Sequence, residues 1–385
     1  MVNKPLQRVV LAERRLTHYR VPLYERIREL LAAKRIDFRL LVGQGTPEEI
    51  AKRDGGHLHW ALALPTHYLF SGAICWQPLG EYLRDVDLVI LSDQNKLVYN
   101  QRLLWGPRPW CLALWGHGRN MQSHSTNGLR ERYRRFTISR ADWYFAYTQI
   151  SVDAVAQTGF PLERITNLNN SIDTSGSRRE RDSIRPGELT ALKRDLGLAG
   201  PVGVFIGSLY ADKRLDFLFQ ACRQLRERVP SFQCLIIGDG VERSKVQRWM
   251  AADDWIHWVG ARQGREKALY LGCADIMLNP GLVGLGIIDS FVYGIPMVTT
   301  DCGKHSPEIA YLRQGENGLI TRDDVNDFAG TVSSLLADPA ALKRMNQACL
   351  SSAAEYSVDA MASRFVEGMV RALATSRHRD LPRSD

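Results

Sequence analysis

The chain has 385 residues, and 50 Lys and Arg residues against 42 Asp and Glu residues give it a formal net charge of +8. This length favours two domains, and a hydrophobic fraction of 45% with a charged fraction of 24% excludes disordered and collagen-like chains. Seven scattered cysteines without a C-x-x-C pair favour free thiols in a reducing cytoplasm over disulfides or a zinc site. No apolar run is long enough to span a bilayer, and the N-terminal run is too short for a signal peptide.

In residues 1–172 the sequence alternates short apolar runs with amphipathic segments. The apolar runs predict strands at Arg8–Ala12, Phe38–Val42, Val86–Leu91, Trp110–Trp115 and Trp143–Tyr147. Between the first two, Leu23, Ile27, Leu30 and Leu31 recur at helical spacing and predict a helix over Pro22–Ala33. Continuous apolar strands separated by helices indicate a parallel sheet that is covered on both faces.

Residues 173–188 are polar, rich in Ser, Gly and Arg, and predict an interdomain linker. The alternation then starts again. Strands are expected at Val202–Ile206, Gln233–Ile237, Trp255–Val259, Ile276–Leu278 and Met297–Thr300. Helices are expected at Leu215–Arg228, Ile287–Tyr293, Asp327–Leu336, Ala340–Ala354 and Asp359–Ala374. Several strands end in glycine just before a helix, where a phosphate can approach the backbone and the helix N-terminus.

The charge is unevenly distributed along the chain. Residues 1–172 carry 23 Lys and Arg against 15 Asp and Glu, whereas residues 173–385 carry 27 of each, so the whole excess lies in the first half. Such an excess is typical either of a solubilising surface or of a surface that meets an anionic membrane, a nucleic acid or a phosphorylated substrate. Nucleic acid is the weakest of these, because no helix-turn-helix or aromatic ladder accompanies the arginines.

An ordered set of motifs carries a family resemblance. It comprises F-I-G-S-L-Y-A-D-K-R-L-D-F-L (205–218), L-I-I-G-D-G (235–240), V-G-A-R (259–262), A-D-I-M-L-N-P (274–280), G-L-G-I-I-D-S-F-V-Y-G-I-P-M-V-T-T-D (284–301), S-P-E-I (306–309) and G-E-N-G-L-I (315–320). The set resembles the donor-binding domain of the retaining glycosyltransferases of family four, which have the GT-B fold. In the first half, W-G-H-G (115–118), Y-F-A-Y-T (144–148) and N-N-S-I-D (169–173) resemble the acceptor domain of the same superfamily.

The resemblance implies an α/β protein with two Rossmann-like, doubly wound domains that face each other across a cleft. The expected division is an acceptor-side domain at 1–172, the linker at 173–188, a nucleotide-sugar domain at 189–358, and a C-terminal helix and tail at 359–385. The helix is expected to pack back on the N-terminal domain.

The implied activity is that of a retaining, metal-independent hexosyltransferase. It moves a sugar from a nucleoside-diphosphate sugar to a lipid-linked or saccharide acceptor in surface polysaccharide assembly, with no cofactor. The expected location is cytoplasmic, peripheral on the inner face of an anionic membrane. Two alternatives stay open: a nucleotide-sugar binding relative with weak or no transfer activity, and a sugar-nucleotide epimerase of the same fold.

By resemblance, Lys213 is a catalytic residue, because its positive charge stabilises the leaving pyrophosphate. Gly207 and Ser208 follow the first donor-domain strand, and Ser208 replaces an arginine that is common in the family. The amides of Gly284, Leu285 and Gly286 would cradle the distal phosphate.

The family places a pair of glutamates near that loop, with seven residues between them. Asp289 stands in the place of the second one, which accepts hydrogen bonds from the ribose hydroxyls, whereas Gly281 occupies the position of the first. Glu308 is either a substitute for the missing carboxylate or an acid that stabilises a helix N-terminus. By the same resemblance, Gly260 belongs to a loop whose backbone contacts the nucleobase. Because no side chain makes this contact, the sequence does not identify the base.

In the first half, His117 matches a histidine that reaches the donor sugar, and a neutral-range pKa suits it to proton transfer. Arg15, His18 and Arg20 cluster after the first strand, and we expect them on the acceptor side. The candidate acids of the site, Asp289 and Glu308, are not arranged as an Asp-x-Asp metal site, which predicts metal independence. Front-face displacement, in which the leaving phosphate takes the acceptor proton, is the mechanism that the resemblance implies.

Overall fold

The computed structural model describes residues 6–51, 54–118 and 129–377. The chain divides into two compact units, the first made of Met1–Asp173 with Val358–Asp385 and the second of Thr174–Ser357. Both are Rossmann-like α/β domains with parallel sheets. The expected fold class is therefore confirmed. The boundaries after residues 173 and 357 lie within two residues of the predicted ones.

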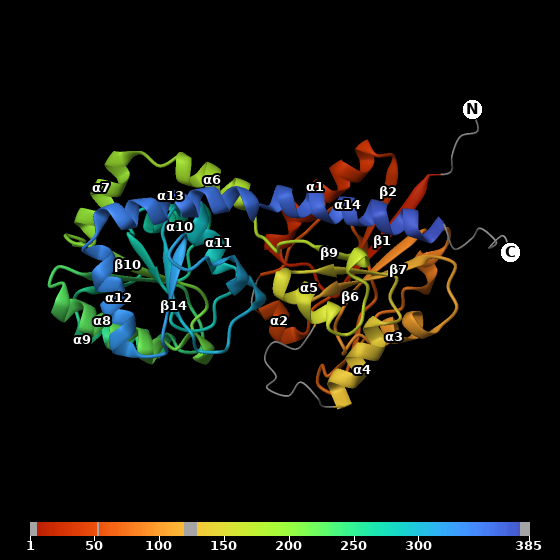
Figure 1. Ribbon diagram of the computed structural model, residues 1–385, viewed down its shortest axis with the longest axis horizontal. Coiled ribbons are helices and arrows are strands. Elements are labelled where there is room, and N and C mark those ends of the chain that lie inside the picture. The colour runs from red at the N-terminus through yellow and green to blue at the C-terminus, as the bar shows by residue number, and fades with distance from the viewer. Residues whose placement is uncertain (1–5, 52–53, 119–128, 378–385) are drawn as a thin grey trace. The chain divides into compact units, whose positions relative to one another are not determined.

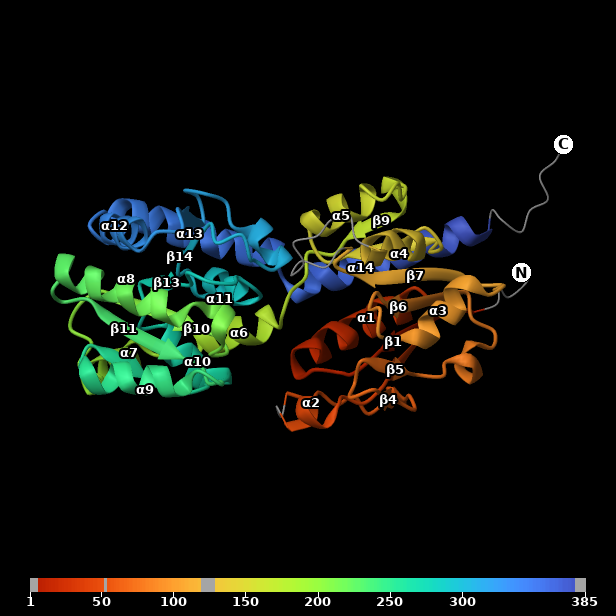
Figure 2. The same cartoon turned by 90° about the horizontal axis from the view of Figure 1, so that it is seen from below.

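The first unit has a seven-stranded parallel sheet in the order β3-β2-β1-β6-β7-β8-β9. Its strands are β1 Gln7–Glu13, β2 Ile36–Val42, β3 Leu62–Ala63, β6 Leu88–Ser92, β7 Cys111–Gly116, β8 Trp143–Ala146 and β9 Ile165–Asn167. Each central strand is buried along most of its length, as its continuous apolar sequence requires. A separate antiparallel pair, β4 His67–Leu69 and β5 Ile74–Trp76, was not predicted, and it lies close to α2 (Pro47–Ala51) in Figure 2.

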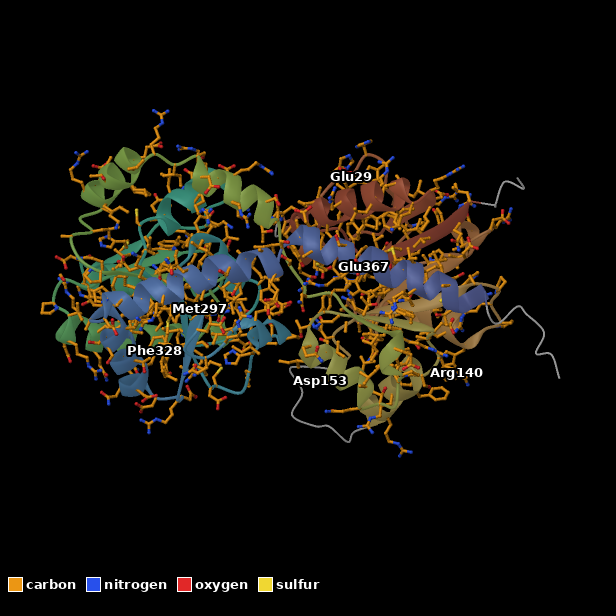
Figure 3. The ribbon with its side chains drawn as sticks, turned by 45° about the horizontal axis from the view of Figure 1, so that its top comes forward. Glu29, Arg140, Asp153, Met297, Phe328 and Glu367 are labelled. Carbon is orange, nitrogen blue, oxygen red and sulfur yellow. The ribbon has the colours of Figure 1, made fainter. Side chains whose placement is uncertain are left out.

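The other helices of this unit are α1 Val21–Ala33, α3 Val98–Trp105, α4 Leu129–Ile138, α5 Gln149–Ala156 and α14 Val358–Arg377, with short 3-10 turns at η1 His18–Arg20, η2 Gly80–Leu83 and η3 Leu162–Arg164. The C-terminal helix α14 packs against α1 and the sheet, as expected (Figure 1). Met361, Phe365, Met369 and Leu373 recur every fourth residue and are all buried. On the opposite face of α14, Glu367 is exposed (Figure 3).

The second unit has a six-stranded parallel sheet in the order β12-β11-β10-β13-β14-β15. Its strands are β10 Val202–Ile206, β11 Gln233–Ile237, β12 Ile256–Trp258, β13 Ile276–Leu278, β14 Met297–Thr300 and β15 Gly318–Thr321. Its helices are α6 Thr174–Asp182, α7 Pro186–Asp195, α8 Leu215–Arg228, α9 Arg243–Ala252, α10 Gly264–Leu271, α11 Gly286–Tyr293, α12 Val325–Leu336 and α13 Pro339–Glu355, with η4 Ala211–Lys213 and η5 Pro307–Tyr311. Met297 on β14 and Phe328 on α12, labelled in Figure 3, are both buried.

The region predicted as a linker differs from the expectation. Residues 174–182 form α6, and α7 begins at Pro186, so both belong to the second unit. Tertiary packing explains the helix in so polar a segment: α6 packs against α10 and α11, and Arg181 donates a hydrogen bond to the carbonyl of Val292. The polar composition of residues 174–182 predicted irregular structure. The residues that α6 packs against lie about a hundred positions away in sequence, so no local pattern reveals the helix.

Candidate functional site

The carboxyl ends of β10, β11 and β12 approach one another through glycine. Gly207 donates its N–H to the carbonyl of Ile237, and Gly238 donates to the carbonyl of Gly260, at 3.0 and 2.9 Å. A Cβ on Gly238 would lie 1.9 Å from the carbonyl oxygen of Gly207, so no other residue fits there. A Cβ on Gly260 would meet nothing within 4 Å. Close backbone packing therefore accounts for Gly238, whereas the role of Gly260 toward a nucleobase stays a prediction.

Lys213 ends the short η4 turn and is buried, with 9% of its surface exposed. Its Nζ donates a 2.6 Å hydrogen bond to the carbonyl of Leu282. Burial lowers the pKa of this lysine to about 8, against the opposing effect of Asp212. The side chain lies beside Gly207, since a Cβ there would be 3.7 Å from Cε of Lys213. A desolvated ammonium bonded to a neutral carbonyl is suited to receiving an anion.

Gly281 packs directly against the η4 turn. A Cβ at this position would lie 2.2 Å from the carbonyl oxygen of Asp212 and 2.6 Å from the carbonyl carbon of Lys213. The next residue, Leu282, donates its N–H to the same Asp212 carbonyl at 2.8 Å. The carboxylate that the family pattern places at 281 is therefore excluded by the backbone that positions Lys213.

The segment Gly284-Leu285-Gly286 leads into α11, and no side chain caps that helix at its N-terminus. A Cβ on Gly286 would lie 3.8 Å from the carbonyl oxygen of Ile206, the last residue of β10. The structure thus brings Gly207, Lys213, Gly281 and Gly286 together at one end of the sheet. Ser208 is exposed just after Gly207.

Two carboxylates predicted at this site are buried. Asp289, in the first turn of α11, forms an ion pair through Oδ1 with Nζ of Lys267 on α10, at 2.8 Å. Sequence reasoning missed Lys267, which follows no motif. Glu308 is 3% exposed and is the second residue of η5. Both interpretations of Glu308 stay open, because it combines deep burial with a helix N-terminal position.

In the first unit, His117 follows β7 and is flanked by two glycines that packing requires. A Cβ on Gly116 would lie 2.7 Å from Cβ of Asp93, and one on Gly118 would lie 2.5 Å from a methyl of Val155. The imidazole packs against the ring of Tyr147, with the ring centroids 4.3 Å apart and the planes tilted by 37°. These contacts fix the backbone of the W-G-H-G segment, and the role of His117 toward a sugar stays a prediction.

The three residues predicted on the acceptor side lie in different environments. His18 is exposed and its Nδ1 lies 3.2 Å from the carbonyl of Asp54. Arg15 forms two 2.8 Å hydrogen bonds with the carboxylate of Asp54. Arg20 is instead buried in the core, with its guanidinium 5.0 Å from the ring of Trp115 and Nη1 3.7 Å from Sδ of Met361 on α14. Its burial and its contact with α14 assign Arg20 to packing of the unit and correct its expected placement on a ligand surface.

Beside Arg15, a hollow of about 340 Å³ opens between the segments that follow β1 and β2. It is lined by Arg15, Leu16, Val42, Gly43, Gly45, Glu49, Ile50, Gly55 and Gly56. Glu49, which lines the hollow, accepts two 2.6 Å hydrogen bonds from Arg14, and Arg14 donates a third to the hydroxyl of Tyr68. Both arginines next to the hollow are therefore neutralised by a bidentate carboxylate. Sequence reasoning missed Glu49 and Asp54, because their partners lie more than thirty residues away.

The Arg14–Glu49 pair predicts a pH dependence of stability. The hydrogen bonds from Arg14 lower the pKa of Glu49 to about 2. A carboxylate with a depressed folded-state pKa stabilises the protein above its unfolded pKa near 4.5, and this stabilisation is lost as the pH falls toward 2. Solvent screens part of this interaction, so Glu49→Gln should remove roughly 1–2 kcal/mol of the stability that the wild type loses between pH 6 and pH 3. Urea unfolding of the wild type and Glu49→Gln at pH 6 and pH 3 measures it. The exposed Glu163→Gln serves as the control, and equal pH responses of all three proteins would contradict the prediction.

Comparison with known proteins agrees with this geometry. Residues 200–338 match the family model described as "Glycosyl transferases group 1". A D-inositol 3-phosphate glycosyltransferase of Nocardia farcinica is 27% identical over 309 residues, which cover 76% of this chain and 62% of that protein. The chain thus spans less than two thirds of that relative's length. A GDP-mannose-dependent alpha-(1-6)-phosphatidylinositol monomannoside mannosyltransferase of Mycolicibacterium smegmatis is 29% identical over 195 residues, covering 46% of this chain and 49% of its own.

Among solved structures, Anabaena Alr3699/HepE in complex with UDP superposes with a TM-score of 0.68 at 15% identity, covering 95% of this chain and 100% of that one. This likeness shows the fold. Residues 200–338 thus match a glycosyl transferases group 1 domain, and the chain as a whole is similar in sequence to glycosyltransferases and in fold to a GT-B glycosyltransferase structure.

Proposed function

We propose that the protein is a retaining hexosyltransferase that moves a sugar from a nucleoside-diphosphate sugar to a hydroxyl of a saccharide or lipid-linked acceptor in surface polysaccharide assembly. The observation that carries this proposal is the buried ammonium of Lys213, bonded to the Leu282 carbonyl beside Gly207 and the N-terminus of α11. Backbone amides and a desolvated cation are the groups that stabilise a leaving diphosphate.

In the proposed reaction the bond between the anomeric carbon and the phosphate oxygen breaks, and a bond to the acceptor oxygen forms on the same face. The acceptor proton passes to the leaving phosphate, so the reaction needs no protein nucleophile. Lys213 offsets the charge that develops on the diphosphate. His117 is the proposed contact to the donor sugar in the first unit.

The hollow beside Arg15 supports a hydroxyl-bearing acceptor. Its lining includes the guanidinium of Arg15, which is paired with Asp54, and the carboxylate of Glu49, which is paired with Arg14. Paired groups of this kind offer both donors and acceptors to vicinal hydroxyls, and they leave little local net charge for an anion. The excess positive charge of residues 1–172 is then available for the proposed contact with an anionic membrane on its cytoplasmic side.

In the part of the chain that the structure describes, no helix is long and apolar enough to cross a membrane. The same residues contain no group of three or more His, Cys, Asp or Glu side chains placed to hold a metal ion. We propose that transfer is independent of metal ions, and activity in the presence of a chelator tests this.

A nucleotide-sugar binding protein without transfer activity is the second candidate, because Gly281 and Ser208 replace two family contacts. One experiment separates the two functions. Calorimetry with UDP-, GDP- and ADP-hexoses measures binding, and mass spectrometry of saccharide and lipid-linked acceptors measures transfer with and without EDTA. Transfer that survives EDTA supports the proposal, and the configuration of the product tests retention. Binding without transfer supports the second candidate, and the absence of both contradicts the proposed function.

The low pKa of Lys213 predicts that diphosphate binding takes up a proton. The free lysine has a pKa of about 8 because of burial, and a bound diphosphate would raise it. We therefore expect proton uptake at pH 8 and an affinity for UDP or GDP that falls as the pH rises above 8. Calorimetry in two buffers with different ionisation enthalpies measures the uptake. Lys213→Arg, which keeps its charge, should bind without this uptake, and equal uptake in both proteins would contradict the assignment.

A further inference from the structure

His305 joins two segments of the second unit that the family motifs do not connect. Its Nδ1 lies 3.2 Å from the backbone N of Val283, in the loop before α11. Its Nε2 lies 2.8 Å from the carbonyl oxygen of Thr300, the last residue of β14. The imidazole therefore bridges the end of a strand to the loop that leads into Gly284-Leu285-Gly286.

The two backbone partners determine the proton arrangement on this imidazole. The amide of Val283 can only donate, so Nδ1 accepts, and the carbonyl of Thr300 can only accept, so Nε2 carries the proton. The neutral Nε2–H tautomer satisfies both bonds. A proton added at Nδ1 would face the N–H of Val283 and break the bond to the loop.

The loop is held on both sides of the Leu282–Val283 peptide. On one side, Leu282 receives a hydrogen bond from Lys213 and donates one to Asp212. On the other side, Val283 donates to His305, and its carbonyl accepts the N–H of Ser306 at 2.9 Å. Val283 itself is fully buried. The orientation of the amides that follow, at Gly284 to Gly286, depends on these bonds.

We propose that His305 is a positioning residue of the diphosphate site, which holds the loop of residues 281–286 in its anion-binding conformation, and that Cys302 makes this bridge sensitive to thiol modification. The proposal rests on the proposed function for the identity of the ligand, but the bridge itself rests on the hydrogen bonds alone.

Cys302 supplies the second part of this inference. Its Sγ lies 3.6 Å from Nε2 of His305, and it is the one cysteine of the seven that is not buried. Burial acts to raise the pKa of this thiol, but its hydrogen bonds with the side chain of His305 and the backbone of Lys304 lower it to about 7. The Asp301 carboxylate and Lys304 are the neighbouring charged groups on the same segment. A group attached to Sγ would compete for the space of the imidazole and displace it from Thr300.

The first test measures binding and kinetics in the full chain. We expect His305→Ala to raise the Kd for UDP or GDP and the donor KM about fivefold to tenfold, with kcat changed less than twofold. His305→Asn should recover most of this loss, because Oδ1 can still accept the Val283 N–H. His257→Ala is the matched control, since that histidine bonds to Gln233 away from the loop. Unchanged Kd and KM in His305→Ala would overturn the positioning role.

The second test uses iodoacetamide, which forms a thioether on Cys302 and releases iodide. We expect one equivalent of label in the native protein, a loss of nucleotide affinity similar to that of His305→Ala, and a slower reaction in His305→Ala at pH 7. Cys302→Ser should bind nucleotide normally and resist the reagent. Labelled wild type with unchanged affinity overturns the sensitivity to modification.

A failure of the proposed function would look different. If no nucleoside diphosphate binds even the wild type, the proposed function fails, but the labelling rates still test the contact between His305 and Cys302. A slower reaction in His305→Ala than in the wild type then supports the contact between the two side chains, and equal rates overturn it.

Discussion

Replacing Lys213 by Met should lower kcat/KM for sugar transfer by roughly a thousandfold. The methionine keeps the volume of the side chain beside Gly207 but removes the ammonium that bonds to Leu282. Removing a single preorganised group that stabilises developing charge typically lowers kcat by a hundredfold to a thousandfold. The loss here should lie at the upper end, because the leaving diphosphate is highly charged. Steady-state kinetics with the nucleotide sugar identified by the binding screen measures the loss.

The variant should stay folded, because it removes a buried charge whose lowered pKa reflects the cost of burial. Its thermal midpoint should equal or exceed that of the wild type. Lys343→Met, on the exposed surface of α13, is the matched control and should keep full activity. A Lys213→Met protein within threefold of wild-type kcat/KM would falsify the assignment of this lysine to the leaving diphosphate.

Restoring the carboxylate of the family pattern with Gly281→Glu should destabilise the protein and should not raise its activity. The new Cβ would lie 2.2 Å from the carbonyl oxygen of Asp212, and the clash is with backbone that cannot rotate away. Forced overpacking of this kind costs about 3 kcal/mol, which corresponds to a decrease in Tm of about 6–12 °C for a unit of this size. Differential scanning calorimetry measures the shift, and the transfer assay measures the activity.

Two further variants separate shape from charge. Gly281→Ala carries the same Cβ without a carboxylate, so it should lose nearly as much stability. Gly284→Ala lies in the same loop, but its Cβ would meet nothing closer than 3.7 Å, so its Tm should change little. A stable Gly281→Ala protein would contradict the account of this position as one fixed by backbone packing.

The strands were most predictable where the chain is buried on both sides. β10, β11, β13 and β14 begin and end at the predicted residues, because a continuous apolar run has few alternatives to a central parallel strand. The short strands β4 and β5 were missed, since their sequence is mixed and their stability comes from neighbours. Helix α6 was also missed, because its sequence is polar and its packing against α10 and α11 is not apparent from local sequence.

The site was predictable only where chemistry and local sequence coincide. Lys213 and the glycines were predicted from the family resemblance of their motifs, and the structure brings them together. The partners that hold them do not follow from any pattern: Lys267 pairs with Asp289 over 22 residues, and His305 reaches Val283 over the same separation. Arg20 shows the opposite error, because an arginine near a loop looks available in sequence while three aromatic rings enclose it in the fold.

The placement of α14 sets an order for the synthesis and folding of the chain. The first unit contains residues from both ends of the sequence, with the whole second unit inserted between Asp173 and Val358. While the ribosome is still producing residues 174–357, the rings of Trp115 and Phe145 lack Phe365, which covers them in the finished protein. The second unit can therefore complete its core first, and the first unit must wait for the last helix. In a nascent chain that stalls before residue 358, the apolar surface that α14 covers would stay exposed in the N-terminal half and would be open to chaperones and proteases.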